Sequence, residues 1–382
     1  MTVSISNAVF RVDSSLVIGT GHLRRCLTLA NLLKEYGTDC HFITRSQEGS
    51  LESLVAQNGH EVHLLEDSFQ SQSELHGDED SEYSSWLMGG WREDSKLCKE
   101  ILNQIRPEWL IVDHYGIDNH WERELSGCVG QILVIDDLAN RQHSCNLLLD
   151  QNLGRSPADY FELVPKTCSV LTGPEFALLR PEFSENREYS LQRRKTSSTF
   201  KVLISMGGVD LDNVTGRVLD ALLQCSLPID VELIVVMGGA SPWIKEIERQ
   251  ASNIPWKVEV KVDASNMAHL MANSDLAIGA VGSTTWERCC LGLPSILIPV
   301  AENQRVACKE LAETGVAIVV EDDKQFKSLL CAAISELLTN RDLLNRISEL
   351  SASVTNGLGA YSILERMQKF ECDEGVVKCI LT

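Results

Sequence analysis

The sequence first excludes several classes of protein through what it lacks. No apolar run approaches the roughly 20 residues that a membrane-spanning helix needs, so we expect no membrane insertion. The opening residues, MTVSISNAVF, hold neither a basic segment nor a long apolar stretch, and we therefore expect no signal peptide. The 382 residues, 44% of them hydrophobic and 23% charged, have the composition of a globular protein and are enough for two domains.

Paired cysteine motifs are also missing. The 13 cysteines are scattered along the chain without a C-x-x-C pair, which argues against a disulfide framework and against a structural metal site. We therefore expect reduced thiols throughout, a cytoplasmic location and no bound metal.

Positive charge is scarce. The chain has 34 basic and 54 acidic residues and a formal net charge of −20. This balance argues against general binding to nucleic acid or to an anionic membrane. The protein could still bind a small anionic ligand at a site where backbone N–H groups and a few arginines make the local charge positive.

What is present is a regular alternation of apolar strands and amphipathic helices. It occurs in two series, which predicts an α/β protein with two Rossmann-like domains and mostly parallel sheets. The first domain is expected at 1–183, a polar linker at 184–198, and the second domain at 199–340. A helical segment at 341–382 could cross back to the first domain. Residues 67–95 are polar and acidic, and we expect a long loop there.

Ligands of open α/β sheets bind beyond the carboxyl ends of the strands, and several motifs fall there. In IGTGH, the glycines Gly19 and Gly21 allow close approach of a ligand to a helix N-terminus. His22 follows at the start of that helix, where the helix dipole favours a neutral imidazole that could accept a proton from water. The alternative is a histidine that merely caps the helix. Of the neighbouring arginines, Arg24 is the better candidate for contacting substrate.

Two acidic motifs follow strands of the first domain. VDHYG contains Asp113, His114 and Tyr115, and VIDDL contains Asp136 and Asp137. Carboxylates at such places commonly cap the next turn or helix, and we favour that interpretation over a metal site.

The second domain carries two glycine-containing turns. SMGGVD places Gly207 and Gly208 after its first strand, in a turn that suits a phosphate but is not a Walker loop. GAVGSTTWERCCLGLPSILIPVAENQ, from Gly279 to Gln304, is the most informative stretch. The hydroxyls of Ser283 and Thr284 and the helix N-terminus could hold a diphosphate. Glu287 could accept hydrogen bonds from both ribose hydroxyls. Asn303 and Gln304 of ENQ could bind sugar hydroxyls or acetamido groups. A capping box is the alternative, although its spacing fits poorly.

Six ordered blocks carry a more specific resemblance. They are VIGTGHLRRCLTLA, WLIVDHYGID, DDLANRQHSCNLLLDQN, DYFELVPKTCSVLTGPEFALLRPEF, SMGGVD and STTWERCCLGLPSILIPVAENQ. Together they resemble the UDP-2,4-diacetamido-2,4,6-trideoxy-β-L-altropyranose hydrolases of pseudaminic acid synthesis, over roughly residues 8–320. The second half is also similar to the N-acetylglucosaminyltransferases that make lipid II.

The resemblance implies a GT-B-like fold with the two domains facing across a cleft. It implies hydrolysis of a UDP-sugar, in which water attacks the anomeric carbon with inversion and without metal or cofactor. His22 would be the general base. Substrate-binding residues would be Tyr115, Arg180, Asn303, Gln304 and Arg24. The UDP-binding residues would be Gly21, Gly207, Gly208, Ser283, Thr284 and Glu287.

Two alternatives remain open at this point. A glycosyltransferase of the same architecture would pass an N-acetylated sugar from UDP to an acceptor, and a non-catalytic protein would bind the UDP-sugar without turnover. The sequence leaves the sugar stereochemistry and the oligomeric state undetermined.

Overall fold

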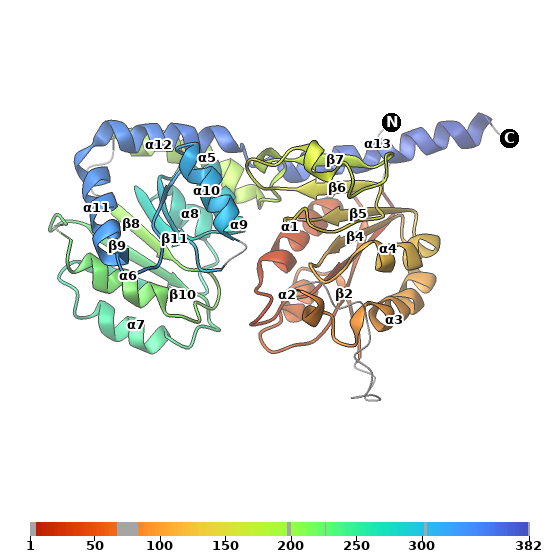
Figure 1. The fold of residues 1–382 in the computed structure, drawn as a ribbon, viewed down its shortest axis with the longest axis horizontal. Helices are drawn as coiled ribbons and strands as arrows, with labels where there is room; N and C mark the ends of the chain where they lie inside the picture. The colour runs from red at the N-terminus through yellow and green to blue at the C-terminus, as the bar shows by residue number, and fades with distance from the viewer. Residues whose placement is uncertain (1–4, 67–82, 197–199, 226, 302–303, 381–382) are drawn as a thin grey trace. The chain divides into compact units, whose positions relative to one another are not determined.

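The computed structural model describes residues 5–66, 83–196, 200–225, 227–301 and 304–380. The chain forms two compact units (Figure 1). Unit 1 comprises Met1–Leu178 and Ala360–Thr382, and unit 2 comprises Leu179–Gly359. Each unit has its own parallel sheet, and each is described separately below.

Unit 1 is built on a seven-stranded parallel sheet in the order β3-β2-β1-β4-β5-β6-β7. Its strands are β1 (Asn7–Val12), β2 (Asp39–Thr44), β3 (Glu61–Leu64), β4 (Trp109–Asp113), β5 (Gln131–Ile135), β6 (Leu147–Asp150) and β7 (Ser169–Thr172). Its helices are α1 (Gly21–Glu35), α2 (Glu52–Gln57), α3 (Gly90–Ile105), α4 (Asn119–Leu125) and α13 (Gly359–Ile380), with short 3-10 turns η1 (Ser84–Trp86), η2 (Ser126–Cys128), η3 (Pro157–Tyr160) and η4 (Pro174–Phe176).

Both faces of this sheet are covered, as the alternation of strands and helices predicts. On one face α1, α2 and α13 pack against Phe10, Phe42 and Ile111. On the other face α3 and α4 pack against Val9 and Leu110. Successive residues of a strand point to opposite faces, so the two cores draw on alternating positions of the same strands.

Unit 2 has a six-stranded parallel sheet in the order β10-β9-β8-β11-β12-β13. Its strands are β8 (Lys201–Ser205), β9 (Glu232–Met237), β10 (Lys257–Val262), β11 (Leu276–Ala280), β12 (Ser295–Ile298) and β13 (Ile318–Val319). Its helices are α5 (Pro181–Thr196), α6 (Val214–Leu222), α7 (Ile244–Ala251), α8 (Met267–Ala272), α9 (Ser283–Cys290), α10 (Arg305–Glu313), α11 (Phe326–Thr339) and α12 (Arg341–Val354).

The region between the domains differs from the prediction. Residues 184–196 are not a polar linker but most of α5, and the boundary between the units lies between Leu178 and Leu179. α5 lacks a continuous apolar stripe, and arginines attach it to the rest of unit 2. Arg187 and Arg194 donate hydrogen bonds to backbone carbonyls of that unit.

The chain returns to unit 1 at its end. Ala360, Ile363, Leu364 and Met367 of α13 are buried in the core of unit 1 against α1 and the sheet. Part of the predicted acidic loop also has regular structure, because η1 and the first turns of α3 fall within 67–95. Residues 67–82 lie outside the described ranges.

The expectation of 13 reduced thiols is wrong for one pair. Cys225, which follows α6, and Cys331 of α11 form a disulfide across 106 residues of sequence. The two helices pack together in the core of unit 2, which scattered cysteines cannot reveal by their spacing. Because Cys225 and Cys331 are oxidised, the cysteines no longer argue for a reducing compartment. Among the described residues, no helix combines the length and apolarity needed to cross a membrane.

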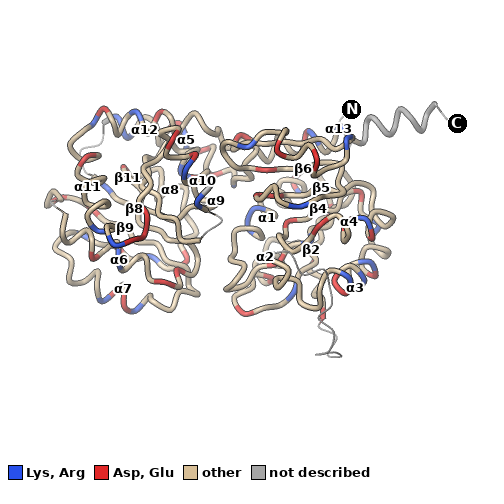
Figure 2. The backbone as a smooth tube through the Cα atoms, viewed as in Figure 1, with Lys and Arg blue, Asp and Glu red and all other residues tan. Residues whose placement is uncertain are grey.

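Figure 2 shows acidic and basic residues interspersed along both units.

Candidate active site

In unit 1 the predicted residues gather where the order of the strands reverses. β1 and β4 lie side by side, with Val12 paired to Asp113, and the chain leaves them toward helices on opposite faces. The carboxyl ends of such neighbouring strands are the usual ligand edge of an open α/β sheet. α1 begins there at Gly21, and His22 is its second residue.

His22 is held by Asp113. Its Nδ1 lies 2.7 Å from Oδ1 of Asp113, and the His22 side chain is 12% exposed while that of Asp113 is fully buried. An Nδ1–H that donates to this carboxylate leaves the Nε2 lone pair available as an acceptor. The arrangement therefore suits a general base whose ring orientation is fixed by a carboxylate.

Arg25 binds both oxygens of the same carboxylate. Its Nε and Nη2 donate to Oδ2 and Oδ1 of Asp113 at 2.6 and 2.7 Å, which is a bidentate pair. Burial alone would raise the pKa of Asp113, but Arg25 and then His22 outweigh it and hold the pKa well below its ordinary value. Asp113 is therefore ionised whenever the protein is folded near neutral pH.

Aromatic side chains pack beside His22. The Tyr115 ring meets the His22 ring edge-on, with centroids 4.7 Å apart, and the Tyr115 hydroxyl donates to Asp137 at 2.8 Å. Trp86 stacks on Tyr115 at 5.3 Å. Arg25 also reaches Asp137, so a continuous polar chain runs from His22 to Tyr115. Burial, reinforced by Asp137, raises the pKa of Tyr115, which stays protonated and acts as a donor.

The two arginines after His22 have different surroundings. Arg24 is exposed and Arg25 is buried. Arg24 thus lies on the surface of α1, and its predicted contact with substrate stays a prediction; Gly21 is the first residue of that helix. The importance of Arg25 and Asp113 was missed, because nothing in one sequence shows that α1 and the end of β4 adjoin.

In unit 2 a second group lies at the corresponding reversal of strand order. β8 and β11 are neighbours, with Ser205 paired to Gly279. Gly207 has a positive φ of 91° in the turn after β8, a conformation that favours glycine. Ser283 and Thr284 begin α9 after β11. Gly207, Gly208, Ser283 and Thr284 are therefore brought to one edge of the sheet.

The start of α9 is suited to bind an anion. The hydroxyl that bonds back to the Gly282 N–H belongs to Thr285, at 3.3 Å, so the capping box does not involve Ser283 or Glu287. The first N–H groups of a helix have no acceptor within it, and the helix dipole favours negative charge there.

A buried arginine lies under this helix end. Arg288 is 2% exposed, and its Nη2 donates to the Ala280 carbonyl at 2.6 Å and to Thr285 Oγ1 at 3.3 Å, rather than to a carboxylate. Burial lowers the pKa of Arg288 to about 10, so the guanidinium remains charged at neutral pH. A Cβ at Gly279 would lie 2.2 Å from Arg288 Nη1, which explains the glycine. Sequence reasoning did not identify Arg288 as a source of positive charge here.

Other predicted residues, Arg180 and Gln304, also belong to unit 2. Arg180 Nη2 lies 3.8 Å from Oε1 of Glu287, and its Nη1 pairs with Glu182 at 2.8 Å. Gln304 directly precedes α10, and its Oε1 accepts from the Val300 N–H at 2.9 Å. Asn303 lies outside the described residues. The structure thus joins Arg180 to Glu287.

Comparison with known proteins gives a match to one domain family over part of the chain and several relatives of low identity. Residues 201–366 match the glycosyltransferase family 28 C-terminal domain. The UDP-2,4-diacetamido-2,4,6-trideoxy-beta-L-altropyranose hydrolase of Campylobacter jejuni is 27% identical over 314 residues, which cover 81% of this chain and 97% of the hydrolase. The uncharacterized protein MJ1062 of Methanocaldococcus jannaschii is 26% identical over 299 residues, and the match spans 77% of this chain but only 55% of that protein.

The fold has relatives among solved structures. The crystal structure of Acinetobacter baumannii MurG superposes with a TM-score of 0.68 at 14% identity, covering 95% of this chain and 99% of MurG. At that identity the match concerns the fold alone. The chain therefore has a GT-B-like fold of two Rossmann-like domains, and its predicted resemblance to the UDP-diacetamido-sugar hydrolases is confirmed.

Proposed function

We propose that this protein is a hydrolase that releases UDP from UDP-2,4-diacetamido-2,4,6-trideoxy-β-L-altropyranose. The coarser conclusion, an enzyme acting on a UDP-sugar, is supported by the Campylobacter relative over most of both chains. The observation that carries the hydrolytic proposal is the His22–Asp113 pair, in which an Nδ1–H donated to Asp113 would leave Nε2 to accept a proton.

In the proposed reaction, Nε2 of His22 removes a proton from water as the water oxygen bonds to the anomeric carbon. The bond from that carbon to the phosphate oxygen breaks, and UDP leaves with the electron pair. Attack from the side opposite UDP inverts the anomeric configuration. Tyr115, Arg180, Gln304, Asn303 and Arg24 would contact the substrate.

The leaving group acquires negative charge, and unit 2 offers compensation for it. The N-terminus of α9 with Ser283 and Thr284, the turn at Gly207 and Gly208, and the charged Arg288 can stabilise a diphosphate. Glu287 would accept hydrogen bonds from the ribose hydroxyls, and Gly21 would approach UDP from the start of α1. We therefore propose a reaction that requires neither metal nor cofactor.

The match to the glycosyltransferase family 28 C-terminal domain favours a second candidate, a transferase. Incubation of the purified protein with the UDP-sugar and no acceptor separates the two. A hydrolase releases one UDP per sugar consumed, a transferase releases little, and a protein that only binds releases none.

Replacement of His22 by glutamine tests the proposed base. His22→Gln should lower UDP release about 10²–10⁴-fold, the usual contribution of general-base catalysis, while UDP binding measured by calorimetry is retained. His120→Gln is the matched control, because His120 is an exposed histidine of α4 that pairs with Asp118. Near-normal turnover by His22→Gln would remove His22 from the mechanism.

A further inference from the structure

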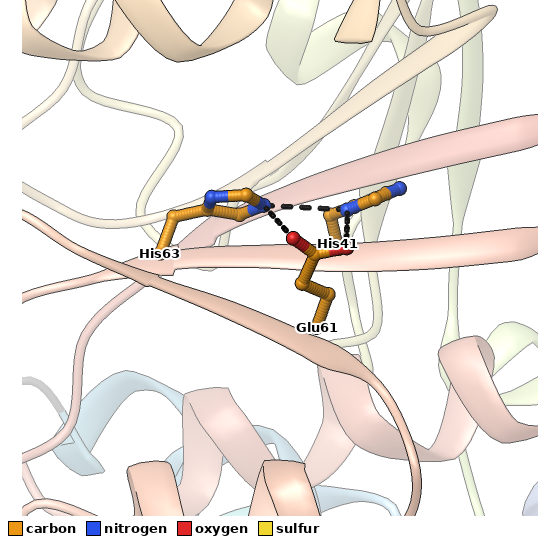
Figure 3. A group of neighbouring side chains, drawn as sticks. All are labelled: His41, Glu61 and His63. Atoms are coloured by element: carbon orange, nitrogen blue, oxygen red, sulfur yellow. Dashed lines mark hydrogen bonds and ion pairs between the residues drawn. The ribbon is translucent and has the colours of Figure 1, made fainter.

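Two edge strands of unit 1 carry a side-chain cluster that the proposed reaction does not use. β3 is the outermost strand and β2 is its neighbour, and their register pairs His41 with Glu61 and Ile43 with His63. Since alternate residues of a strand share a face, His41, Glu61 and His63 all stand on one face of the sheet. Figure 3 shows the two imidazoles and the carboxylate converging.

The donor atoms of this cluster are close together. His41 Nδ1 lies 3.3 Å from His63 Nε2 and 3.3 Å from Glu61 Oε2, and His63 Nε2 lies 3.7 Å from Glu61 Oε1. Donors at the Zn²⁺ bond lengths of tetrahedral sites are separated by about 3.3–3.5 Å. The three side chains therefore already have nearly the spacing of three corners of a zinc tetrahedron.

We propose that His41, Glu61 and His63 bind one Zn²⁺ ion, with water as the fourth ligand. Two imidazoles and one carboxylate suit zinc, whereas magnesium and calcium prefer oxygen ligands alone. The side chains of His41 and His63 are 17% and 23% exposed and that of Glu61 is 63% exposed, so an ion and a water can reach the cluster from solvent.

The ion would join the edge strand to the rest of the sheet. An ion that binds the folded protein better than the unfolded chain raises the stability of the fold. The site departs from the expectation of no metal, which rested on cysteine spacing, on the acidic motifs and on the family resemblance. Its ligands come from two strands separated by α2, so no short sequence motif marks it.

Metal titration of the full-length protein tests the site without reference to turnover. After removal of metals with a chelator, calorimetry should show one equivalent of Zn²⁺ binding to the wild type. His41→Ala and His63→Ala should each weaken binding at least tenfold, and Zn²⁺ should raise the melting temperature of the wild type but not of these variants. His63→Gln is a milder substitution that serves if the alanine variant does not fold, as judged by circular dichroism.

His120→Ala is the control, because His120 Nδ1 lies 3.1 Å from Asp118 Oδ2 on the surface of α4. It should bind zinc like the wild type. Cobalt substitution should give the visible absorption of a tetrahedral ion with nitrogen and oxygen ligands. The proposal is overturned if the wild type shows no saturable zinc binding, if the folded His41 and His63 variants bind as tightly as the wild type, or if cobalt shows thiolate charge transfer.

Discussion

Two buried carboxyl groups of unit 1, those of Asp136 and Asp150, both lie beside the Tyr160 hydroxyl and differ in protonation. The hydroxyl lies 3.0 Å from Asp136 Oδ2 and 2.9 Å from Asp150 Oδ2. A hydroxyl can donate to only one of them at a time, so a proton on the other carboxyl would complete the pair of hydrogen bonds. Burial, reinforced by the charge of Asp137, raises the pKa of Asp150 to about 7. Asp136 pairs with Arg141 at 2.7 Å, which favours its ionised form. Asp150, whose Oδ2 lies farther from its own arginine, at 3.3 Å from Arg155 Nε, is therefore the carboxyl that holds the proton below about pH 7.

This arrangement predicts a dependence of stability on pH. Between the ordinary aspartate pKa of about 4 and the folded value of about 7, the folded chain keeps the Asp150 proton and the unfolded chain loses it. The stabilising contribution of this group is complete below pH about 4 and is lost as pH rises through about 7. Asp150→Asn cannot ionise and can still donate to Tyr160.

Urea denaturation across this range measures the effect. The free energy of unfolding of Asp150→Asn minus that of the wild type should increase as pH rises, because only the wild type must give up the proton. A difference that stays constant between about pH 4 and pH 8 would show that Asp150 titrates alike in both states.

Glu287 gives a prediction on nucleotide recognition. If it accepts hydrogen bonds from the ribose hydroxyls, Glu287→Gln should weaken UDP binding about tenfold, as expected for loss of a charge-assisted bond. The 2′,3′-dideoxy analogue of UDP lacks both hydroxyls and should bind equally to wild type and variant. Calorimetry measures the affinity of both ligands for the wild type and the variant. If Glu287→Gln weakened the binding of UDP and of the dideoxy analogue equally, Glu287 would not contact the ribose hydroxyls.

At the scale of elements, α5 shows how a charged segment can be fixed in place. Arg194 is 6% exposed and donates to the carbonyls of Ser274, Leu291 and Gly292 at 2.7–3.0 Å. Arg187 donates to the carbonyls of Thr355 and Ala352. These carbonyls follow α8, α9 and α12 or end them, where they lack partners within their own helices. The arginines thus attach α5 to three helices.

Loss of one of these arginines should destabilise unit 2. Arg194→Met leaves buried carbonyls without their donors, which we expect to lower the free energy of unfolding by about 1–3 kcal/mol. Arg249→Met is the matched control, because Arg249 is exposed and pairs with Glu246 on the surface of α7, and its loss should change stability by less than about 0.5 kcal/mol. Guanidinium denaturation checks both. An Arg194→Met protein as stable as the wild type would contradict this role of α5.

Prediction from sequence succeeded where apolar periodicity is strong and failed where polar contacts decide. The buried strands β1, β4, β8 and β11 were all recognised from their apolar runs. The edge strand β3 was missed because EVHL is short and largely polar, and α5 was mistaken for a linker because its partners are carbonyls. Both errors concern contacts between distant segments.

At the scale of the whole molecule, the two units place their candidate residues at the same position of the fold. Each places its candidate residues beside two central parallel strands where the strand order reverses. The sequence predicted this edge, and with it His22, Tyr115, Ser283 and Thr284, because the motifs directly follow apolar strands. The sequence did not predict the His22–Asp113 pair, the position of Arg288 under α9 or the Cys225–Cys331 disulfide. Each of these is a contact that only the folded chain brings about.

The most direct test of the proposed activity is an isotope experiment without acceptor. The purified protein is incubated with the UDP-sugar in ¹⁸O-labelled water containing EDTA. The amount of released UDP and its ¹⁸O content are then determined by mass spectrometry. Attack of water on the anomeric carbon predicts one unlabelled UDP per sugar consumed. Absence of UDP release, or UDP that carries ¹⁸O from attack at phosphorus, would contradict the account.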